Sequence, residues 1–140
     1  MKKTILVLCL AIIPLAGLCP LNEKRIYIPV YEGINPYKSI WKAASMVESN
    51  NDTLAYNPIE KAVGIVQIRP IRLKDYNKRA GKSYKLQDCY NEKISREIFF
   101  YYISKYEADD ISGICKDWNG SGQKHKEYIK KIKKQLSKLR

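Results

Sequence analysis

A carboxylate is the only kind of side chain in this sequence whose placement favours catalysis, and Glu48 is the most unusual one. The chain has one histidine, His125, within a lysine-rich stretch, and no histidine–cysteine cluster with the spacing of metal ligands. No glycine-rich phosphate loop follows a predicted strand. We therefore expect no metal, no cofactor and no cysteine–histidine nucleophile, which leaves acid–base chemistry at a carboxyl group.

Glu48 lies near the end of a predicted helix that begins at Asn35-Pro36 and runs to about Ser49. Four residues at i, i+3, i+4 and i+7 share one face of this helix: Trp41, Ala44, Ser45 and Glu48. Burial on an aromatic face and the negative end of the helix dipole both disfavour a carboxylate, so we expect a raised pKa and a group that donates a proton near neutrality. From periodicity alone, a structural carboxylate is the alternative.

Three segments in order carry a family resemblance. They are Glu48-Ser49, then Ala55-Tyr56-Asn57 with Gly64-Ile65-Val66-Gln67-Ile68, and then Trp118-Asn119-Gly120. Between Ile40 and about Ile132 the chain resembles the catalytic core of soluble lytic transglycosylases and goose-type lysozymes. The resemblance implies a lysozyme-like, mainly α domain of five to six helices that cleaves peptidoglycan.

The resemblance also implies roles for individual residues. Glu48 would protonate the oxygen between N-acetylmuramic acid and N-acetylglucosamine, and its carboxylate would then accept the proton of the muramoyl 6-hydroxyl, leaving a 1,6-anhydro end. Ser49 would support the Glu48 loop, and the remaining predicted sugar contacts are Tyr56, Gln67, Trp118 and Asn119. Without the motif context, the preferred interpretation of Gln67 and Asn119 is a pair of amides that stabilise turns.

Some residues depart from the family pattern. Trp118 stands where the family usually has a tyrosine whose hydroxyl lies near the acid, and Asn50-Asn51 replaces a more apolar pair. If Asp117 or Asp52 faced Glu48 at roughly 6.5 to 9.5 Å, water could be activated and the enzyme would be an inverting hydrolase. A catalytically inactive domain that binds peptidoglycan or a secretion apparatus is the alternative from a different functional class.

The N-terminus predicts export. Residues 1–19 have the charged start and short apolar run of a signal peptide, with Cys19 a candidate lipid anchor, and residues 20–36 are expected to form an extended lead-in. Residues 37–140 are then the single catalytic domain. In an exported chain Cys89 and Cys115 predict a disulfide, with two buried free thiols as the alternative.

Further helices are predicted from caps and apolar spacing, with little room for a sheet. A short helix is expected to start at 57–60, followed by helices over 70–80, 91–106, 111–118 and 123–139. The last one carries a lysine-rich face beside an apolar stripe that includes Tyr128 and Ile132.

The formal net charge of +12 indicates a polyanionic partner. Export makes nucleic acid an unexpected ligand, so we expect the polyanion to be the glycan strands of the wall. We also expect the protein to be a monomer. An anionic envelope surface and a secretion or conjugation apparatus are further candidate partners.

Overall fold

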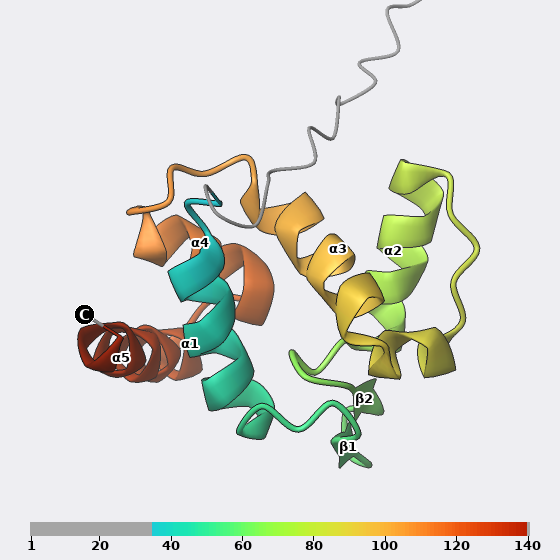
Figure 1. The fold of residues 1–140 in the computed structure, drawn as a ribbon, viewed down its shortest axis with the longest axis horizontal. Helices are drawn as coiled ribbons and strands as arrows, with labels where there is room; N and C mark the ends of the chain where they lie inside the picture. Colours follow the sequence, from blue (N-terminus) through green and yellow to red (C-terminus); the bar gives the residue numbers. More distant parts are fainter. Residues whose placement is uncertain (1–34, 140) are drawn as a thin grey trace, which may run out of the picture.

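The computed structural model describes residues 35–139, which fold into a mainly α domain (Figure 1). The predicted export signal, and the lead-in up to residue 34, lie outside the described residues. The elements in chain order are α1 (Lys38–Ser49), β1 (Tyr56–Asn57), β2 (Ala62–Val63), α2 (Pro70–Ala80), the 3-10 helix η1 (Leu86–Tyr90), α3 (Glu92–Ile103), α4 (Ile111–Asn119) and α5 (Gln123–Lys138). The predicted α class is confirmed.

Asparagines lie in the segments that flank helix α1 on both sides. The side chain of Asn35 accepts a hydrogen bond from the Tyr37 amide at 2.9 Å, and the turn that it closes places the first helical residue at Lys38, slightly later than predicted. Asn50 and Asn51 end the helix in the left-handed conformation, with φ of 57° and 65°. Asparagine tolerates this conformation better than most side chains, so the predicted stop near Ser49 is confirmed.

The prediction of a helix that starts at Asn57 is wrong, because a hairpin occupies this segment. The Asn57 side chain does accept hydrogen bonds from the amides of Ile59 and Glu60, at 3.0 and 3.3 Å, as a helix cap would. However, the chain reverses after one turn, because Lys61 adopts a φ of 51°. The next two residues, Ala62 and Val63, are buried and pair with β1 as an antiparallel hairpin.

The later helices largely follow the prediction. Helix α2 has Pro70 at its start and the left-handed Gly81 after its end, as expected. Helix α3 ends at Ile103, three residues before the predicted end, and η1 was not predicted. In α4, the side chain of Asp110 accepts the Gly113 amide at 2.8 Å, which confirms it as the cap.

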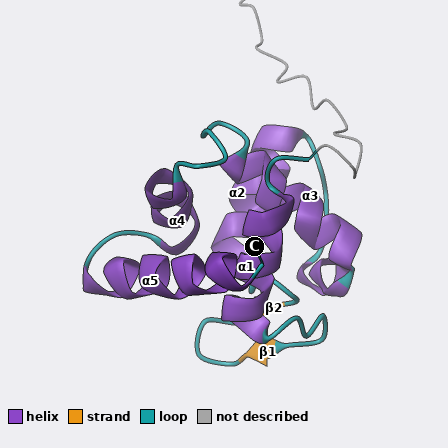
Figure 2. Cartoon of the chain, turned by 60° about the vertical axis from the view of Figure 1, so that its left-hand side comes forward, coloured by secondary structure: helices purple, strands orange, loops and turns teal. Residues whose placement is uncertain are grey.

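The core lies where α1, α3, α4 and α5 meet. Helix α5 crosses α1 and lies beside α4 (Figure 2). Its apolar stripe is buried at Tyr128 and Ile132, whereas its lysines are exposed, so this helix closes the core with one face. Aromatic side chains fill the centre: the rings of Trp41 and Trp118 both meet Phe99 edge-on, at centroid distances of 5.5 and 4.7 Å.

The predicted disulfide is absent. Cys89 and Cys115 are both buried free thiols, and burial raises the pKa of each to about 12. The two thiols have different surroundings. Cys89 lies in η1 with its sulfur 4.0 Å from the Lys85 carbonyl oxygen, whereas Cys115 lies in α4, where the charge of Glu48 adds to the rise in its pKa. Within residues 35–139, no helix is both long and apolar enough to cross a membrane.

Candidate active site

Glu48 lies in the last turn of α1, where three helices converge. The residue is partly exposed but its carboxyl is deeply buried, and the side chains of Trp118 from α4 and Tyr128 from α5 offer hydrogen bonds to it. Both of these neighbours are themselves buried. The structure thus brings together an acid and two donors that are up to 80 residues apart in the chain.

Burial raises the pKa of Glu48 from 4.5 to about 7. The hydrogen bonds from Tyr128 and Trp118 and the positive charge of Arg69 act in the opposite direction, and the negative charge of Glu60 adds to the rise. Burial exceeds the stabilising contacts because removing a carboxylate from water is costly unless strong partners replace the water. The predicted upward shift is confirmed, and both forms of Glu48 are populated near neutral pH.

Tyr128 is the site residue that sequence reasoning missed. Its buried hydroxyl has no partner among residues 35–139 that meets the usual distance and angle limits for a hydrogen bond, so its interaction with Glu48 is a loose one. Burial, followed by the charge of Glu48, raises its pKa well above the ordinary value, so the hydroxyl stays protonated. The sequence offers a weak signal, since Tyr128 is the polar member of the apolar stripe of α5.

Trp118 offers its indole N–H to Glu48, and the rest of its ring is buried. Only 4% of the residue is exposed, and the Arg72 guanidinium lies 4.6 Å from the ring centroid. The ring is therefore packed in the core instead of being open for sugar stacking. Asn119, one residue later, is half-exposed and its side-chain amide makes no hydrogen bond with another described residue, so it is free to contact a ligand.

Ser49 holds α1 against the segment that follows the hairpin, and Gly64 lets that segment approach η1 closely. The Ser49 hydroxyl donates to the Ile65 carbonyl at 2.8 Å, which fixes the residue next to Glu48, as the predicted supporting role requires. Gly64 has a φ of 77°, and a β-carbon there would lie 2.2 Å from the Cys89 carbonyl oxygen. This close approach requires glycine.

The Gln67 side chain is turned toward its own loop. Its amide donates to the carbonyls of Gly64 and Ala55, at 3.0 and 3.4 Å. Gln67 also has a φ of 52°, which is strained for a residue with a side chain. These contacts fit the turn-stabilising interpretation, and the amide oxygen is left to accept a bond from a ligand.

Tyr56 is the exposed aromatic residue of the predicted site. It lies on β1, with 55% of its surface accessible. A ring held on a hairpin edge can stack on a sugar without any rearrangement of the core.

The acid whose charge is felt most by Glu48 is Glu60, whereas the predicted second carboxylates Asp117 and Asp52 have partners of their own. The Asp117 carboxylate forms an ion pair with Lys105 at 3.2 Å. The Asp52 side chain accepts a hydrogen bond from the Leu54 amide at 2.8 Å. Glu60 is an exposed residue of the hairpin turn, and its negative charge raises the pKa of Glu48.

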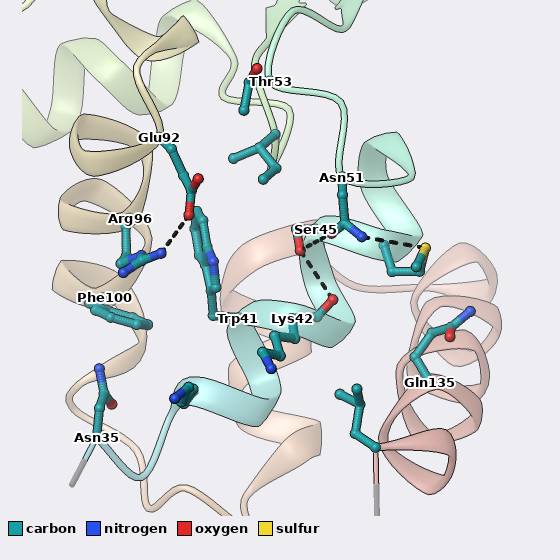
Figure 3. Close-up of a pocket in the computed structure, with 14 residues that line it drawn as sticks. Asn35, Trp41, Lys42, Ser45, Asn51, Thr53, Glu92, Arg96, Phe100 and Gln135 are labelled. Atoms are coloured by element: carbon teal, nitrogen blue, oxygen red, sulfur yellow. Dashed lines mark hydrogen bonds and ion pairs between the residues drawn. The ribbon is translucent and has the colours of Figure 1, made fainter. Parts of the chain in front are cut away.

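Two cavities flank this region without being lined by Glu48. The larger, of about 550 Å³, lies between α1, α3 and the end of α5 (Figure 3). Trp41 lies at its centre, with Arg96 and Phe100 on one side and Ser45, hydrogen-bonded to Asn51 at 2.7 Å, on the other. The smaller, of about 280 Å³, lies on the α2 side and is lined by Arg69 and Arg72.

No three histidine, cysteine, aspartate or glutamate side chains gather within residues 35–139, so the described part of the chain holds no candidate metal site. Comparison with known proteins finds no matching family, no matching curated protein and no matching solved structure. Functional inference therefore depends on the arrangement of groups around Glu48.

Proposed function

We propose that this protein is a peptidoglycan lytic transglycosylase of the lysozyme-like class. It cleaves the β-1,4 bond between N-acetylmuramic acid and N-acetylglucosamine and leaves a 1,6-anhydro-muramoyl end. The observation that carries the proposal is the environment of Glu48, whose pKa of about 7 suits a general acid that must also become a base. The three sequence motifs that surround Glu48 and its neighbours support the same reaction.

In the first step, protonated Glu48 donates its proton to the glycosidic oxygen. The bond between that oxygen and the anomeric carbon of the muramoyl residue breaks, the N-acetylglucosamine hydroxyl leaves, and positive charge develops at the anomeric carbon. In the second step, the Glu48 carboxylate accepts the proton of the muramoyl 6-hydroxyl as that oxygen attacks the anomeric carbon. Glu48 ends the cycle protonated, so the reaction needs no water and no second carboxylate.

Tyr128 and Trp118 act on the carboxylate form of Glu48. Both are donors, and a donor that binds the ionised form more tightly than the neutral form promotes proton release in the first step. Tyr128 also occupies the role that the family resemblance assigns to a tyrosine hydroxyl near the acid, although it comes from α5 and not from the third motif. Tyr56 and Asn119 are the proposed sugar contacts.

Inverting hydrolysis is the second chemical candidate, and Glu60 is the observation that favours it. An exposed carboxylate whose charge reaches Glu48 can activate a water molecule if the sugar lies between the two groups. The candidate outside enzymology is a domain that holds glycan strands or a secretion apparatus and cuts nothing.

The proposed location is the bacterial envelope, with peptidoglycan strands as the main partner. The exposed lysines of α5 suit an anionic wall or membrane surface, and the small size suits local opening of the wall for a secretion or conjugation machine. Cross-linking in cells followed by mass spectrometry tests the last point, since a link to envelope-spanning proteins is expected.

Mass spectrometry of the products tests the proposal most directly. The purified protein is incubated with peptidoglycan, and soluble muropeptides are separated and weighed. Anhydro-muramoyl ends support transglycosylation, whereas reducing muramoyl ends indicate hydrolysis. Absence of soluble products would leave the non-catalytic binding domain, and equal release by Glu48→Gln would rule out Glu48 as the acid.

A further inference from the structure

The smaller cavity is a charged depression on the α2 side of the site. It has a volume of about 280 Å³, and four cationic side chains and two acidic ones line it: Arg69, Arg72, Arg79, Lys105, Asp75 and Asp117. Positive charge therefore exceeds negative charge within a space large enough for a short peptide segment.

Two of the four cations are already neutralised. Arg79 is paired with Asp75 at 2.8 Å, and Lys105 is paired with Asp117 at 3.2 Å. Arg72 is half-buried against two rings, 4.5 Å from the centroid of Tyr102 and 4.6 Å from that of Trp118. One of its nitrogens donates to the carbonyls of Asp117 and Trp118, at 2.7 and 2.9 Å, which clamps the end of α4 in place.

Arg69 is the cation that is left without a close partner. It is half-exposed, and its guanidinium makes neither a hydrogen bond nor an ion pair with another described residue. A planar guanidinium with unused donors is well suited to a carboxylate, which it can bind through two parallel hydrogen bonds.

The cavity adjoins the catalytic acid through two residues. Arg69 lines the cavity, and its charge also reaches the Glu48 carboxyl. Trp118 offers its N–H to Glu48 while one face of its ring covers Arg72. A ligand in the cavity would therefore lie next to a sugar whose glycosidic bond is held at Glu48.

We propose that this cavity binds a carboxylate of the peptide stem attached to the muramoyl residue next to the scissile bond, with Arg69 as its main contact. This inference rests on the proposed function. In peptidoglycan, the lactyl group of the muramoyl residue is joined to the stem as an amide, so the anionic groups near the cut bond belong to the peptide. Because both acids of the cavity are already paired, with Arg79 and Lys105, the cation left without a partner is a single guanidinium, which suits one peptide carboxylate better than a uniformly anionic phosphate polymer.

Peptide binding tests the subsite without any bond being cut. The probe is the free stem tetrapeptide L-Ala-γ-D-Glu-meso-diaminopimelate-D-Ala, titrated by NMR into the Glu48→Gln protein. We expect saturable binding that Arg69→Gln weakens about tenfold, the size of one charged hydrogen-bonded pair. The matched control is Lys74→Gln, which removes the same charge from an exposed position of α2 outside the cavity and should leave binding unchanged. No binding, or equal weakening by both variants, would overturn the subsite.

Activity provides a second readout that separates recognition from an effect on Glu48. The wild-type protein and Arg69→Gln are compared on intact peptidoglycan and on glycan strands whose stems an amidase has removed and whose freed lactyl carboxylates have been converted to amides. We expect Arg69→Gln to lower kcat/KM on intact peptidoglycan about tenfold more than on stripped strands. Equal losses on both substrates would show that Arg69 acts only on the acid and would overturn the subsite. Peptide binding by a protein that cuts neither substrate would instead refute the proposed function and leave the peptide site standing.

Discussion

Two glutamates of this protein have pKa values that are shifted in opposite directions. Glu48 in α1 and Glu97 in α3 each have two side-chain hydrogen-bond donors and one cationic side chain nearby, but the Glu48 carboxyl is the more deeply buried. Burial raises the pKa of both. For Glu48 the net result is a pKa of about 7, whereas hydrogen bonds from Tyr76 and Tyr84 and the charge of Lys82 bring the pKa of Glu97 below its usual value.

The first difference is the depth of burial, because the Glu48 carboxyl is packed much more deeply than that of Glu97. The second is how closely the partners approach. The hydroxyls of Tyr76 and Tyr84 donate to Glu97 at 2.5 and 3.1 Å, and the Lys82 ammonium lies 3.4 Å away. The Tyr128 hydroxyl beside Glu48 makes only a loose contact. A moderately buried carboxyl group with tight donors stays ionised, whereas a deeply buried one with loose donors keeps an exchangeable proton.

Catalysis should depend on only one of the two glutamates. We expect Glu48→Gln to lower the rate of muropeptide release by about 10²- to 10⁴-fold, because the amide cannot donate the proton. Glu97→Gln should keep most of the activity at a temperature where it is folded. If Glu97→Gln lost as much activity as Glu48→Gln in folded protein, the contrast between the two sites would be wrong.

Stability should respond to pH in opposite directions at the two positions. Glu48 has a pKa raised from 4.5, so its ionisation costs no stability below pH 4.5 and at most roughly 3 kcal/mol above pH 7. Glu48→Gln should therefore be more stable than the wild type at pH 8 and equal to it at pH 4, as measured by urea unfolding.

Glu97 is the matched control for that measurement. Its lowered pKa contributes stability above pH 4.5 that is lost as the pH falls through the folded value. Glu97→Gln should cost about 1–2 kcal/mol at neutral pH and less in acid. A stabilising effect of Glu97→Gln at pH 8 would contradict this.

Removing a loose donor should change the acid more than the fold. Tyr128→Phe deletes a hydroxyl that lowers the pKa of Glu48, so the alkaline limb of the kcat/KM profile should move to higher pH. The rate near neutrality should fall about two- to tenfold, because the carboxylate formed in the first step loses a donor. Tyr84→Phe, which deletes a hydroxyl from Glu97, is the control and should leave the profile unchanged. An unshifted limb in Tyr128→Phe would remove Tyr128 from the site.

The smallest expected effect is that of Glu60→Gln. The charge of Glu60 raises the pKa of Glu48, so its removal should move the alkaline limb slightly to lower pH, by an amount that shrinks with added salt because Glu60 is exposed. We expect less than about a threefold change in rate and unchanged anhydro products. A large loss of activity, together with reducing ends in the wild-type products, would instead make Glu60 the base of an inverting hydrolase.

Local rules predicted the part of the site that lies on one helix. The face shared by Trp41 and Glu48, the stop after Ser49 and the direction of the pKa shift all follow from residues within one segment. Caps at Pro70 and Asp110 placed two further helices in the same way.

Long-range contacts could not be predicted from the same rules. Tyr128 is separated from Glu48 by 80 positions, and its hydroxyl could be placed only once α5 was seen to pack on α1. The hairpin was missed because the asparagine cap of a turn is identical to that of a helix, and the outcome depended on the burial of Ala62 and Val63. The disulfide was inferred from the expected compartment, which does not determine whether two positions meet.

The position of Tyr128 has a consequence for synthesis. Glu48 leaves the ribosome long before α5, and until that helix docks the carboxyl is exposed to water and has an ordinary pKa. A nascent or truncated chain that lacks α5 therefore carries an ionised Glu48 at neutral pH. Glu48 can hold a proton near neutral pH only when residues from nearly the whole domain have packed around it. The proposed acid is therefore able to donate a proton only after folding is complete.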